Sequence, residues 1–390
     1  MNILRATLAI AFATLPLTSQ DTLRVGTWNL EHFGGREPRR TEQDVQAIAE
    51  FIRTLDVGVL AVQEVRNREA IGKLVEQLGG EWNFVLGTTG SLSGADGIHV
   101  GFLFDGAKVE FVQAEELLQL PSRTADGKEP IFHRKPVAAV FRARGGGIDF
   151  RAITVHLKAS RGDKNVTKRR GEVNALRTYV EELLRREGED QDVVILGDFN
   201  HTYRALAFQD FTKGGFVEYL KAPRTPPTIV HFDEPIDHVA VTKGIRDDLA
   251  SNRLDVHGTQ AMRDKEKWRT TYSDHIPVTF ELTNVDRDPD ATFAPVGSRQ
   301  WLRPGGAAAA LGSPAEAAVT KTDPATLAVG ATVTVTFAGQ NGIEQLNGRV
   351  AAVDGSWLQV LPTEHADPNR PATLAIPVAR VVQVEVWHAR

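Results

Sequence analysis

Cysteine is absent from the 390-residue chain, and this absence excludes disulfide bonds, thiolate metal sites and cysteine nucleophiles. An excess of positive charge is also lacking, since 45 lysine and arginine residues stand against 50 aspartate and glutamate residues. The formal charge of -5 argues against a surface that binds polyanions in general. It leaves room for a local basic groove over an acidic body.

Long apolar runs are lacking beyond the first twenty residues. Arg5 precedes an apolar stretch at residues 8–17, and small or polar residues follow. This order predicts a signal peptide at residues 1–20, cleaved between Thr18 and Asp21, with a buried terminal strand or helix as the alternative. No second run approaches the roughly 20 residues needed to cross a bilayer. We therefore expect a secreted or periplasmic protein without stable membrane insertion.

The composition is otherwise that of an ordinary folded protein. Apolar residues make up 42% and charged residues 24% of the chain, which supports neither a disordered nor a fibrous protein. At roughly 150 residues per domain, the length allows two or three domains. Changes in pattern indicate a large domain at residues 21–285, a linker at residues 286–326 and a small domain at residues 327–390.

The large domain alternates short apolar runs with helical patterns, which predicts an α/β fold. Residues 23–28 and 57–62 have the pattern of strands. Thr41 and Asp44 have the spacing of a capping box at the start of a helix. Two later helices are indicated by apolar residues at helical spacing, namely Ile71, Leu74, Val75 and Leu78, and then Val173, Leu176, Val180 and Leu183 within residues 171–184.

The small domain follows a stretch rich in alanine, glycine and proline at residues 304–318, which is typical of a linker. Five short strands are expected beyond it, at residues 331–337, 349–353, 357–361, 372–376 and 381–387. They predict a small β-barrel-like domain that faintly resembles SH3-like or Sm-like barrels. Packing against the large domain and recruitment of substrate are its two open roles.

Polar residues stand where strands of the large domain begin or end. Four apolar runs lead into a polar candidate, and two further candidates come directly before a run. If the first four strands run opposite to the last two, all of these groups meet at one rim of the fold. They are Asn29, Glu64, His156, Asp198 with Asn200, Asp237, and Asp274 with His275.

The chemistry of this set is that of a hard metal ion acting on a phosphate ester. Carboxylate and amide oxygens suit Mg²⁺, with Mn²⁺ or Ca²⁺ as alternatives, better than a structural zinc ion. Hydrolysis of a phosphate ester also needs groups that move protons, which His156 and His275 can supply. Taken singly, each residue could be a turn former, a helix cap or a packed histidine. His238 is assigned to packing, since in an extended segment it points away from Asp237.

Six ordered motifs span residues 22–283: Thr27-Trp28-Asn29-Leu30, Val62-Gln63-Glu64-Val65, Thr154-Val155-His156-Leu157-Lys158, Gly197-Asp198-Phe199-Asn200, Ile236-Asp237-His238-Val239 and Ser273-Asp274-His275-Ile276-Pro277-Val278. Together they resemble the endonuclease/exonuclease/phosphatase superfamily, with its deoxyribonuclease-I-like fold. The resemblance implies a four-layered sandwich of two mixed β-sheets flanked by helices. It also implies a divalent-metal-dependent phosphodiesterase.

The resemblance gives the metal-binding and phosphate-facing residues distinct roles. It makes Glu64 the principal metal ligand, assisted by Asn29 and Asp274. Asp198 and Asn200 would face the attacked phosphate.

The resemblance also assigns the two histidines. His275, paired with Asp237, would be the general base, and His156 would contact the phosphate or protonate the leaving group, although these two labels can be exchanged. Relatives often place a glutamate beside the first histidine, on the strand that corresponds to residues 100–104. This sequence has none there, and Asp96 or His99 could substitute for it.

Nucleic acid is the expected substrate. Gln63-Glu64-Val65-Arg66 looks more like the nuclease branch than the lipid branch, and Arg66 could reach a phosphate. Arg161, Lys168 and Arg169 could form a basic wall over the site, unless they are only the solvated start of a helix.

A second basic stretch, Arg36, Arg39 and Arg40, has the same two interpretations. A small phosphate-ester phosphatase and a sphingomyelinase-like lipid phosphodiesterase are the alternative enzymes. A binding protein that retains the fold without activity is the alternative of another class.

Overall fold

A computed structural model describes residues 22–90, 97–221, 226–289 and 291–293, and beyond them the backbone of six strands. The predicted signal peptide at residues 1–20 and most of the predicted linker lie outside the described residues. The chain divides into two compact units, Met1–Ala307 and Ala308–Arg390.

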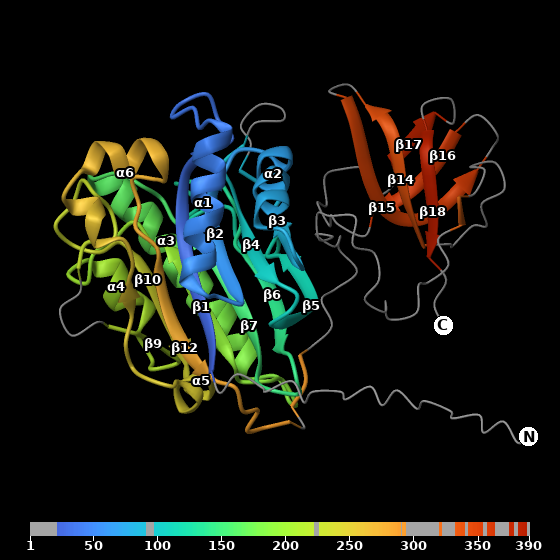
Figure 1. Cartoon of the computed structure of the whole chain (residues 1–390). Coiled ribbons are helices and arrows are strands. Elements are labelled where there is room, and N and C mark those ends of the chain that lie inside the picture. The colour runs from blue at the N-terminus through green and yellow to red at the C-terminus, as the bar shows by residue number, and fades with distance from the viewer. Residues whose placement is uncertain are drawn as a thin grey trace, which may run out of the picture. The chain divides into compact units, whose positions relative to one another are not determined.

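The first unit contains two mixed six-stranded sheets (Figure 1). One sheet has the order β11-β12-β1-β2-β4-β3, with the bounds Asp255–Val256, Val278–Thr283, Thr22–Phe33, Val59–Val65, His99–Asp105 and Trp82–Leu86. The other has the order β5-β6-β7-β8-β10-β9, with the bounds Val109–Glu116, Val137–Ala143, Asp149–His156, Val193–Asp198, Asp237–Thr242 and Val217–Tyr219.

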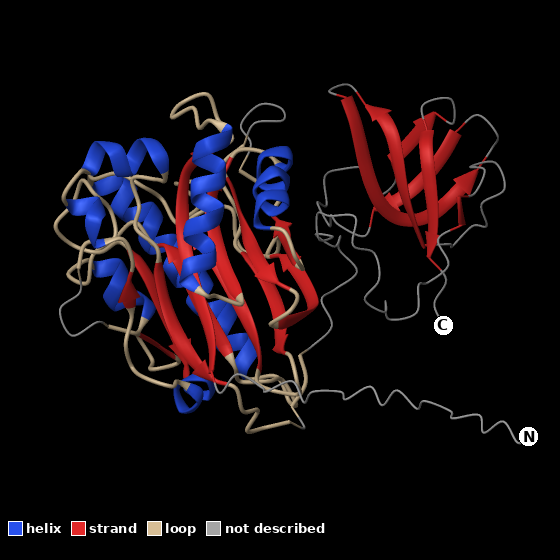
Figure 2. Ribbon diagram, in the orientation of Figure 1, coloured by secondary structure: helices blue, strands red, loops and turns tan. Residues whose placement is uncertain are grey.

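Helices flank the two sheets (Figure 2). They are α1 (Glu42–Leu55), α2 (Arg68–Leu78), α3 (Asp163–Leu184), α4 (Leu206–Phe211), α5 (Lys243–Asp248), the short 3₁₀ helix η1 (Thr259–Met262) and α6 (Lys265–Thr271). Within the described residues, no helix is both long enough and apolar enough to cross a membrane.

Apolar side chains fill three layers of the first unit. Between the sheets, Phe102, Phe141 and Phe280 belong to a fully buried cluster drawn from both sheets. A second cluster, around Trp28 and Trp268, packs α1, α2 and α6 on the first sheet. A third cluster packs α3 and α4 on the second sheet. The expected α/β sandwich of two mixed sheets flanked by helices is confirmed.

The strand directions bring the polar candidates to one rim. β1 and β2 are parallel, and so are β7 and β8. β12 runs antiparallel to β1, and β10 runs antiparallel to β8. The carboxyl ends of the first four strands therefore lie beside the amino ends of the last two. This is the arrangement of opposite directions expected from the sequence.

Two helices show how local sequence sets their boundaries. Thr41 and Asp44 form the predicted capping box of α1, in which each side chain bonds the backbone N–H of the other residue. α3 begins at Asp163 rather than at residue 171. Its first turns are almost wholly polar and therefore carry no apolar period, whereas the later apolar positions are buried as predicted.

The second unit contains one six-stranded sheet in which all neighbouring strands are antiparallel. Its order is β13-β18-β14-β15-β16-β17, with the bounds Thr320–Lys321, Val381–Trp387, Thr332–Gly339, Gly342–Val353, Trp357–Pro362 and Leu374–Pro377. Each of the five strands expected from the sequence corresponds to one of these. β13 is additional, because two residues are too few to show a period.

Candidate active site

Three polar groups converge on one carboxylate oxygen at the rim. Asp198 Oδ2 lies 3.4 Å from His156 Nε2 and 3.8 Å from His275 Nε2. It also accepts a 3.1 Å hydrogen bond from Asn29 Nδ2. Glu64 Oε1 lies 3.6 Å from His156 Nε2 and accepts a 3.3 Å bond from the same amide. Both sheets therefore contribute to a single constellation.

His275 is held by a buried carboxylate. Asp237 Oδ2 lies 2.8 Å from His275 Nδ1, and both side chains are almost fully buried. Antiparallel pairing of β10 with β8 puts Asp237 directly opposite Asp198. The ring is thereby fixed with Nε2 towards Asp198, as a histidine that moves a proton requires.

Glu64 has a strained backbone that aims its side chain into the rim. Its φ is +58°, in the left-handed region that residues with a side chain rarely enter. The pairing of β2 with β4 shifts register at this point, between Val62 and Val65. Glu64 Oε2 accepts a 3.1 Å bond from the His32 N–H and lies 2.9 Å from His32 Nδ1. Such strain persists where the surrounding contacts over-determine it, often at functional sites.

Burial and neighbouring charges give the two histidines opposite properties. Burial and the charge of Arg134 lower the pKa of His156 well below its ordinary value. Burial by itself would lower the pKa of His275 too, but the carboxylates of Asp237 and Asp198 raise it well above that value. Without an added cation, His275 is therefore the ring that holds a proton.

The pKa values of the carboxylates at the rim are shifted as well. Burial opposes the ionisation of Glu64, but the His32 hydrogen bond, the largest opposing effect, lowers its pKa well below the usual range. Burial raises the pKa of Asp198, against the attraction of His275. Asp198 is thus a buried acid whose ionised form needs positive charge beside it.

Glu64, His156 and Asp198 could hold a divalent metal ion. One ligand atom from each lies within 4.8 Å of the other two. Carboxylates suit Mg²⁺ and Mn²⁺, and the imidazole nitrogen also suits a transition metal. The group fits the predicted class of cofactor. Its membership differs from the predicted ligands, of which Glu64 alone belongs to it.

The other two predicted ligands, Asn29 and Asp274, lie beside this group. The amide nitrogen of Asn29 faces both carboxylates, while its Oδ1 accepts a 3.0 Å bond from the Glu31 N–H. A metal bond through that oxygen would require the amide to turn over and release Glu31. Asp274 Oδ1 lies 3.9 Å from His275 Nε2, at the edge of the constellation.

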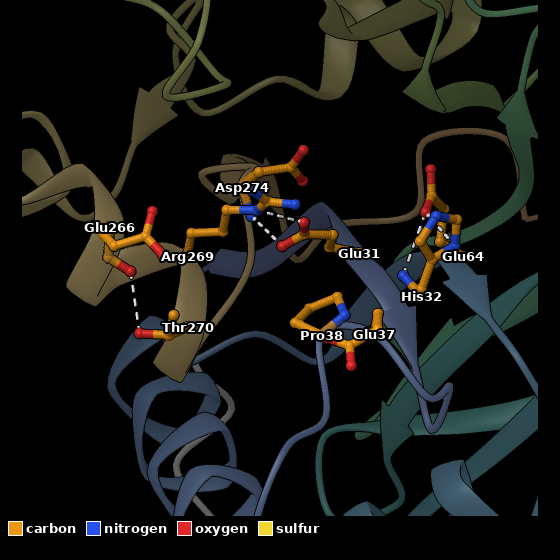
Figure 3. Close-up of a pocket in the computed structure, with 9 residues that line it drawn as sticks. All are labelled: Glu31, His32, Glu37, Pro38, Glu64, Glu266, Arg269, Thr270 and Asp274. Carbon is orange, nitrogen blue, oxygen red and sulfur yellow. Dashed lines mark hydrogen bonds and ion pairs between the residues drawn. The ribbon is translucent and has the colours of Figure 1, made fainter.

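Glu31 is a residue that the sequence did not reveal, and it organises the mouth of the site (Figure 3). Its buried carboxylate accepts bonds from Arg269 Nε at 2.6 Å, from the Asp274 N–H at 3.0 Å and from Arg40 at 3.4 Å. The side chain of Arg40 is almost fully buried, so this residue braces the mouth and does not belong to an exposed basic wall. The only sequence signal for Glu31 is an acid directly after the Asn29 motif.

The predicted substrate-binding residues beyond β7 have three different surroundings. Arg161 is exposed, with its guanidinium 5.9 Å from the centre of the Phe232 ring. Lys168 pairs with Glu129 at 3.5 Å. Arg169 is buried and donates to backbone carbonyls of the loop after β7, so its contacts are those of a residue that fixes this loop.

Arg66, the fourth predicted substrate-binding residue, directly follows β2 and is half-buried. Its N–H donates a 2.8 Å bond to the Phe33 carbonyl, which joins the ends of β1 and β2. Its Nε has no hydrogen-bond partner among the residues that the structure describes.

The first histidine lacks the partner that relatives supply. His156 Nδ1 has no hydrogen-bond partner in the described part of the chain. His99, one suggested substitute, has its Nδ1 2.8 Å from the Thr89 carbonyl, and Asp96 lies outside the described residues. The orientation of His156 therefore depends on the carboxylates that face its Nε2.

Asn200 and His238 support the rim from behind. The Asn200 N–H donates a 2.8 Å bond to Asp198 Oδ1, and its side chain donates a 3.2 Å bond to the Leu157 carbonyl. His238 is fully buried, with Nε2 2.7 Å from the His201 carbonyl, which confirms its assignment to packing.

Similarity to known proteins agrees with this geometry. Residues 26–275 match the model of the Endonuclease/Exonuclease/phosphatase family. The chain belongs to this family. A deoxyribonuclease from Thioalkalivibrio sp. (strain K90mix) is 30% identical over 315 residues, covering 77% of this chain and 82% of the relative. Family membership makes the chain a hydrolytic, nuclease-like enzyme rather than an inactive binding protein.

Solved structures of this family share the fold. The endonuclease/exonuclease/phosphatase from Bacteroides vulgatus has a TM-score of 0.51 at 18% identity, over 67% of this chain and 99% of that chain. A family protein from Bacteroides thetaiotaomicron has a TM-score of 0.49 at 20% identity, over 67% of this chain and 97% of that chain. The first of these similarities supports the sandwich described above.

Proposed function

We propose that this enzyme is a divalent-metal-dependent phosphodiesterase that hydrolyses nucleic acid, with DNA as the first substrate to test. The observation that carries the proposal is the convergence of His156, His275 and Asn29 on Asp198 Oδ2, next to Glu64. The name of the 30% identical relative, deoxyribonuclease, supports the substrate class.

Glu64 and Asp198 would hold the metal ion. When bound, the ion supplies positive charge that neutralises the phosphoryl oxygens. Asn29 keeps the two carboxylates together through its amide nitrogen, and the Asn200 N–H fixes the second oxygen of Asp198. Imidazole is a poor ligand for Mg²⁺, so His156 Nε2 is left for the phosphate.

The two histidines would then act on the phosphate and on water. His275, oriented by Asp237, would accept the proton of the attacking water at Nε2 as the water oxygen bonds to phosphorus; the leaving oxygen departs with the electron pair of the broken bond and takes a proton from solvent. His275 can act as a base only when neutral, and a cation held by Asp198 would favour the neutral ring by offsetting one of the carboxylate charges, after that of Asp237, that raise its pKa. His156 Nε2–H contacts the phosphate, as a donor that burial keeps uncharged.

Positive charge beside His156 supports a polyanionic substrate. The pKa of Lys158 is lowered by burial and by the neighbouring charges of Arg134 and Lys168, so several cations lie close together after β7. Such clusters bind phosphate backbones without reading sequence. Arg161, three residues after Lys158, is exposed to solvent.

An exposed aromatic ring supports nucleic acid over small esters. Phe232 is 41% exposed, and its loop is fastened to the site by a 2.8 Å bond from the Val230 N–H to the Asp274 carbonyl. The backbone of Ile229, in the same loop, forms an isolated antiparallel β-bridge with that of His275. Bases stack on aromatic faces with little regard to sequence, so Phe232 would receive a base next to the cleaved phosphate.

A panel of substrates tests the proposal. Purified protein is incubated with plasmid DNA, RNA, sphingomyelin vesicles and a simple phosphate monoester, each with Mg²⁺, Mn²⁺, Ca²⁺ or a chelator. We expect nicking of the plasmid that the chelator stops and that Glu64→Gln lacks. Hydrolysis of only the lipid or the monoester would reject nucleic acid as substrate while retaining the metal site.

Export and the second unit are further parts of the proposal. The pattern of residues 1–20 supports a signal peptide, and determination of the N-terminus of secreted protein tests it. The series of short strands separated by turn residues in the sequence of the second unit favours a barrel-like domain. Full activity on soluble DNA of a chain that ends at residue 293 would exclude an essential catalytic role for this unit.

A further inference from the structure

A second acidic cluster lies at the opposite rim of the sandwich. Asp190 and Asp192 stand just before β8, and Asp288 comes from the segment after β12. One carboxylate oxygen of each lies within 4.8 Å of the other two. At about 3.3 Å per residue along β8, the cluster is about 20 Å from the catalytic Asp198.

The side chain of Asp190 lacks a partner that a cation would supply. Asp190 is 1% exposed, and its Oδ1 accepts a 2.7 Å bond from the Asp192 N–H. Its Oδ2 is buried and has no hydrogen-bond partner in the described part of the chain. A buried polar atom without a partner destabilises the fold, and an ionised one does so more strongly.

The surroundings of the cluster contain acids and few free cations. Burial and the neighbouring acids raise the pKa of Asp190 to about 7 and that of Asp192 to about 9. The guanidinium of Arg287 lies 2.7 Å from Asp248 Oδ1. None of the three clustered acids forms an ion pair with a residue that the structure describes. Lys243 and Arg287 also line the adjoining cavity, but neither forms an ion pair with these three acids in the described part of the chain.

We propose that Asp190, Asp192 and Asp288 bind a calcium ion. Ca²⁺ takes six to eight oxygen ligands in a flexible geometry, and its sites are built largely from carboxylates. Asp192 and Asp288 also line a cavity beside α5, from which water can complete the shell. Mg²⁺ keeps its own water and demands a stricter octahedron, so a loose group of three carboxylates favours Ca²⁺.

The ion would fasten the chain where it leaves the catalytic unit. The Asp190 N–H donates a 3.0 Å bond to the Thr292 carbonyl, and the Thr292 N–H donates a 3.2 Å bond to the Gly188 carbonyl. Asp288 lies in this departing segment, whereas Asp190 and Asp192 lead into β8. The ion therefore joins two segments nearly a hundred residues apart. Its role is structural, and it stands whether or not the proposed substrate is correct.

Calcium-dependent stability in a variant without the catalytic ligand tests this site. In the full chain carrying Glu64→Gln, millimolar Ca²⁺ should raise the melting temperature by about 5 °C or more over chelator. With Asp288→Asn added, the shift should vanish, while the melting temperature in chelator should not fall, because a repelling charge has gone. Asp247→Asn, an exposed acid lining the same cavity, is the matched control and should keep the full shift.

Two further results decide against the site. It is overturned if Ca²⁺ leaves the melting temperature of the Glu64→Gln protein unchanged, or if Asp288→Asn and Asp190→Asn both keep the shift. An equal response to Mg²⁺ overturns the assignment to calcium. DNA cleavage by Asp288→Asn alone should stay within twofold of the parent in Mg²⁺, which separates this site from the failure of the catalytic one.

Discussion

The buried acids at the two ends of β8 have different neighbours. At the catalytic rim, Asp198 meets two imidazoles and an amide within hydrogen-bonding or near-contact distance. At the opposite rim, Asp190 and Asp192 meet further acids. Burial of an acid is therefore not enough to mark a catalytic centre. Groups that exchange protons distinguish the first rim, whereas acids alone are suited to hold a static ion.

The largest effect on this comparison is expected from a substitution at His275. His275→Ala removes the ring that Asp237 orients, and turnover on DNA should fall by about 10²- to 10⁴-fold, the usual effect of losing a positioned proton-transfer group. His257→Ala is the control, because His257 is half-buried and bonds Thr279 on the same sheet. Nicking rates with Mg²⁺ measure both. A His275→Ala enzyme within fivefold of the parent would remove the histidine from the mechanism.

Two ion pairs near the opposite rim differ in how deeply they are buried. Glu189, next to Asp190, lies 2.7 Å from Arg151, and both side chains are almost fully buried. Arg151→Met should lower the free energy of unfolding by about 3–5 kcal/mol, since a buried carboxylate loses its partner. Arg142→Met breaks a pair in which the arginine is half-exposed although Asp149 is buried, and it should lower the free energy of unfolding by less, about 1–2 kcal/mol.

Urea unfolding in chelator at pH 7 measures this difference. Equal losses for Arg151→Met and Arg142→Met would show that this rim tolerates a buried acid that has lost its guanidinium partner, and would weaken the argument from Asp190.

The buried His238 makes the stability of the fold depend on pH. Burial lowers the pKa of His238 to about 4, below its ordinary value of 6.5. The unfolded chain therefore takes up this proton first. The stability that His238 contributes is complete above pH 6.5 and is lost as the pH falls towards 4, by up to about 3 kcal/mol.

His238→Gln should remove this part of the acid sensitivity. Glutamine keeps a donor for the His201 carbonyl but does not titrate. Urea unfolding at pH 7 and pH 4 compares the variant with the parent. The same loss between the two pH values in both proteins would contradict the prediction.

The smallest expected effect concerns the substrate rather than the rim itself. Phe232→Ala should weaken the use of DNA by roughly 1–3 kcal/mol, seen mainly in KM, because a stacked base is lost. Hydrolysis of a small phosphodiester should not change. Leu206→Ala removes another exposed apolar side chain and serves as the control. Equal losses on DNA and on the small ester would assign Phe232 a structural role.

Much of the catalytic rim could be predicted because its residues stand at the ends of apolar runs. The period of the strands, together with the assumption that the last two run opposite to the first four, placed Asn29, Glu64, His156 and Asp198 at one rim with Asp237 and His275. Glu31 and His32 escaped because both have left-handed backbones after the strand pattern has ended, with φ of +42° and +51°. These residues lie in the irregular end of β1, where the pairing with β2 shifts register, and side-chain directions there cannot be read from a two-residue period.

Contacts between distant segments could not be predicted from the sequence for another reason. A polar helix start shows no inward side, so the burial of Arg169 had no signal in its neighbours. The approach of Asp288 to Asp190 depends on where the chain turns after the last strand of the sandwich, and the acidic residues there had the pattern of a linker. Sequence period predicts elements, whereas these contacts depend on their packing.

The pairing of β1 with both β2 and β12 makes activity a property of the completed chain. A chain interrupted before β12 has no His275 and leaves one edge of β1 unpaired. A fragment that ends shortly before His275 therefore lacks the ring that Asp237 orients, and the complementary piece lacks Asn29, Glu64, His156 and Asp198, so neither fragment carries the whole constellation.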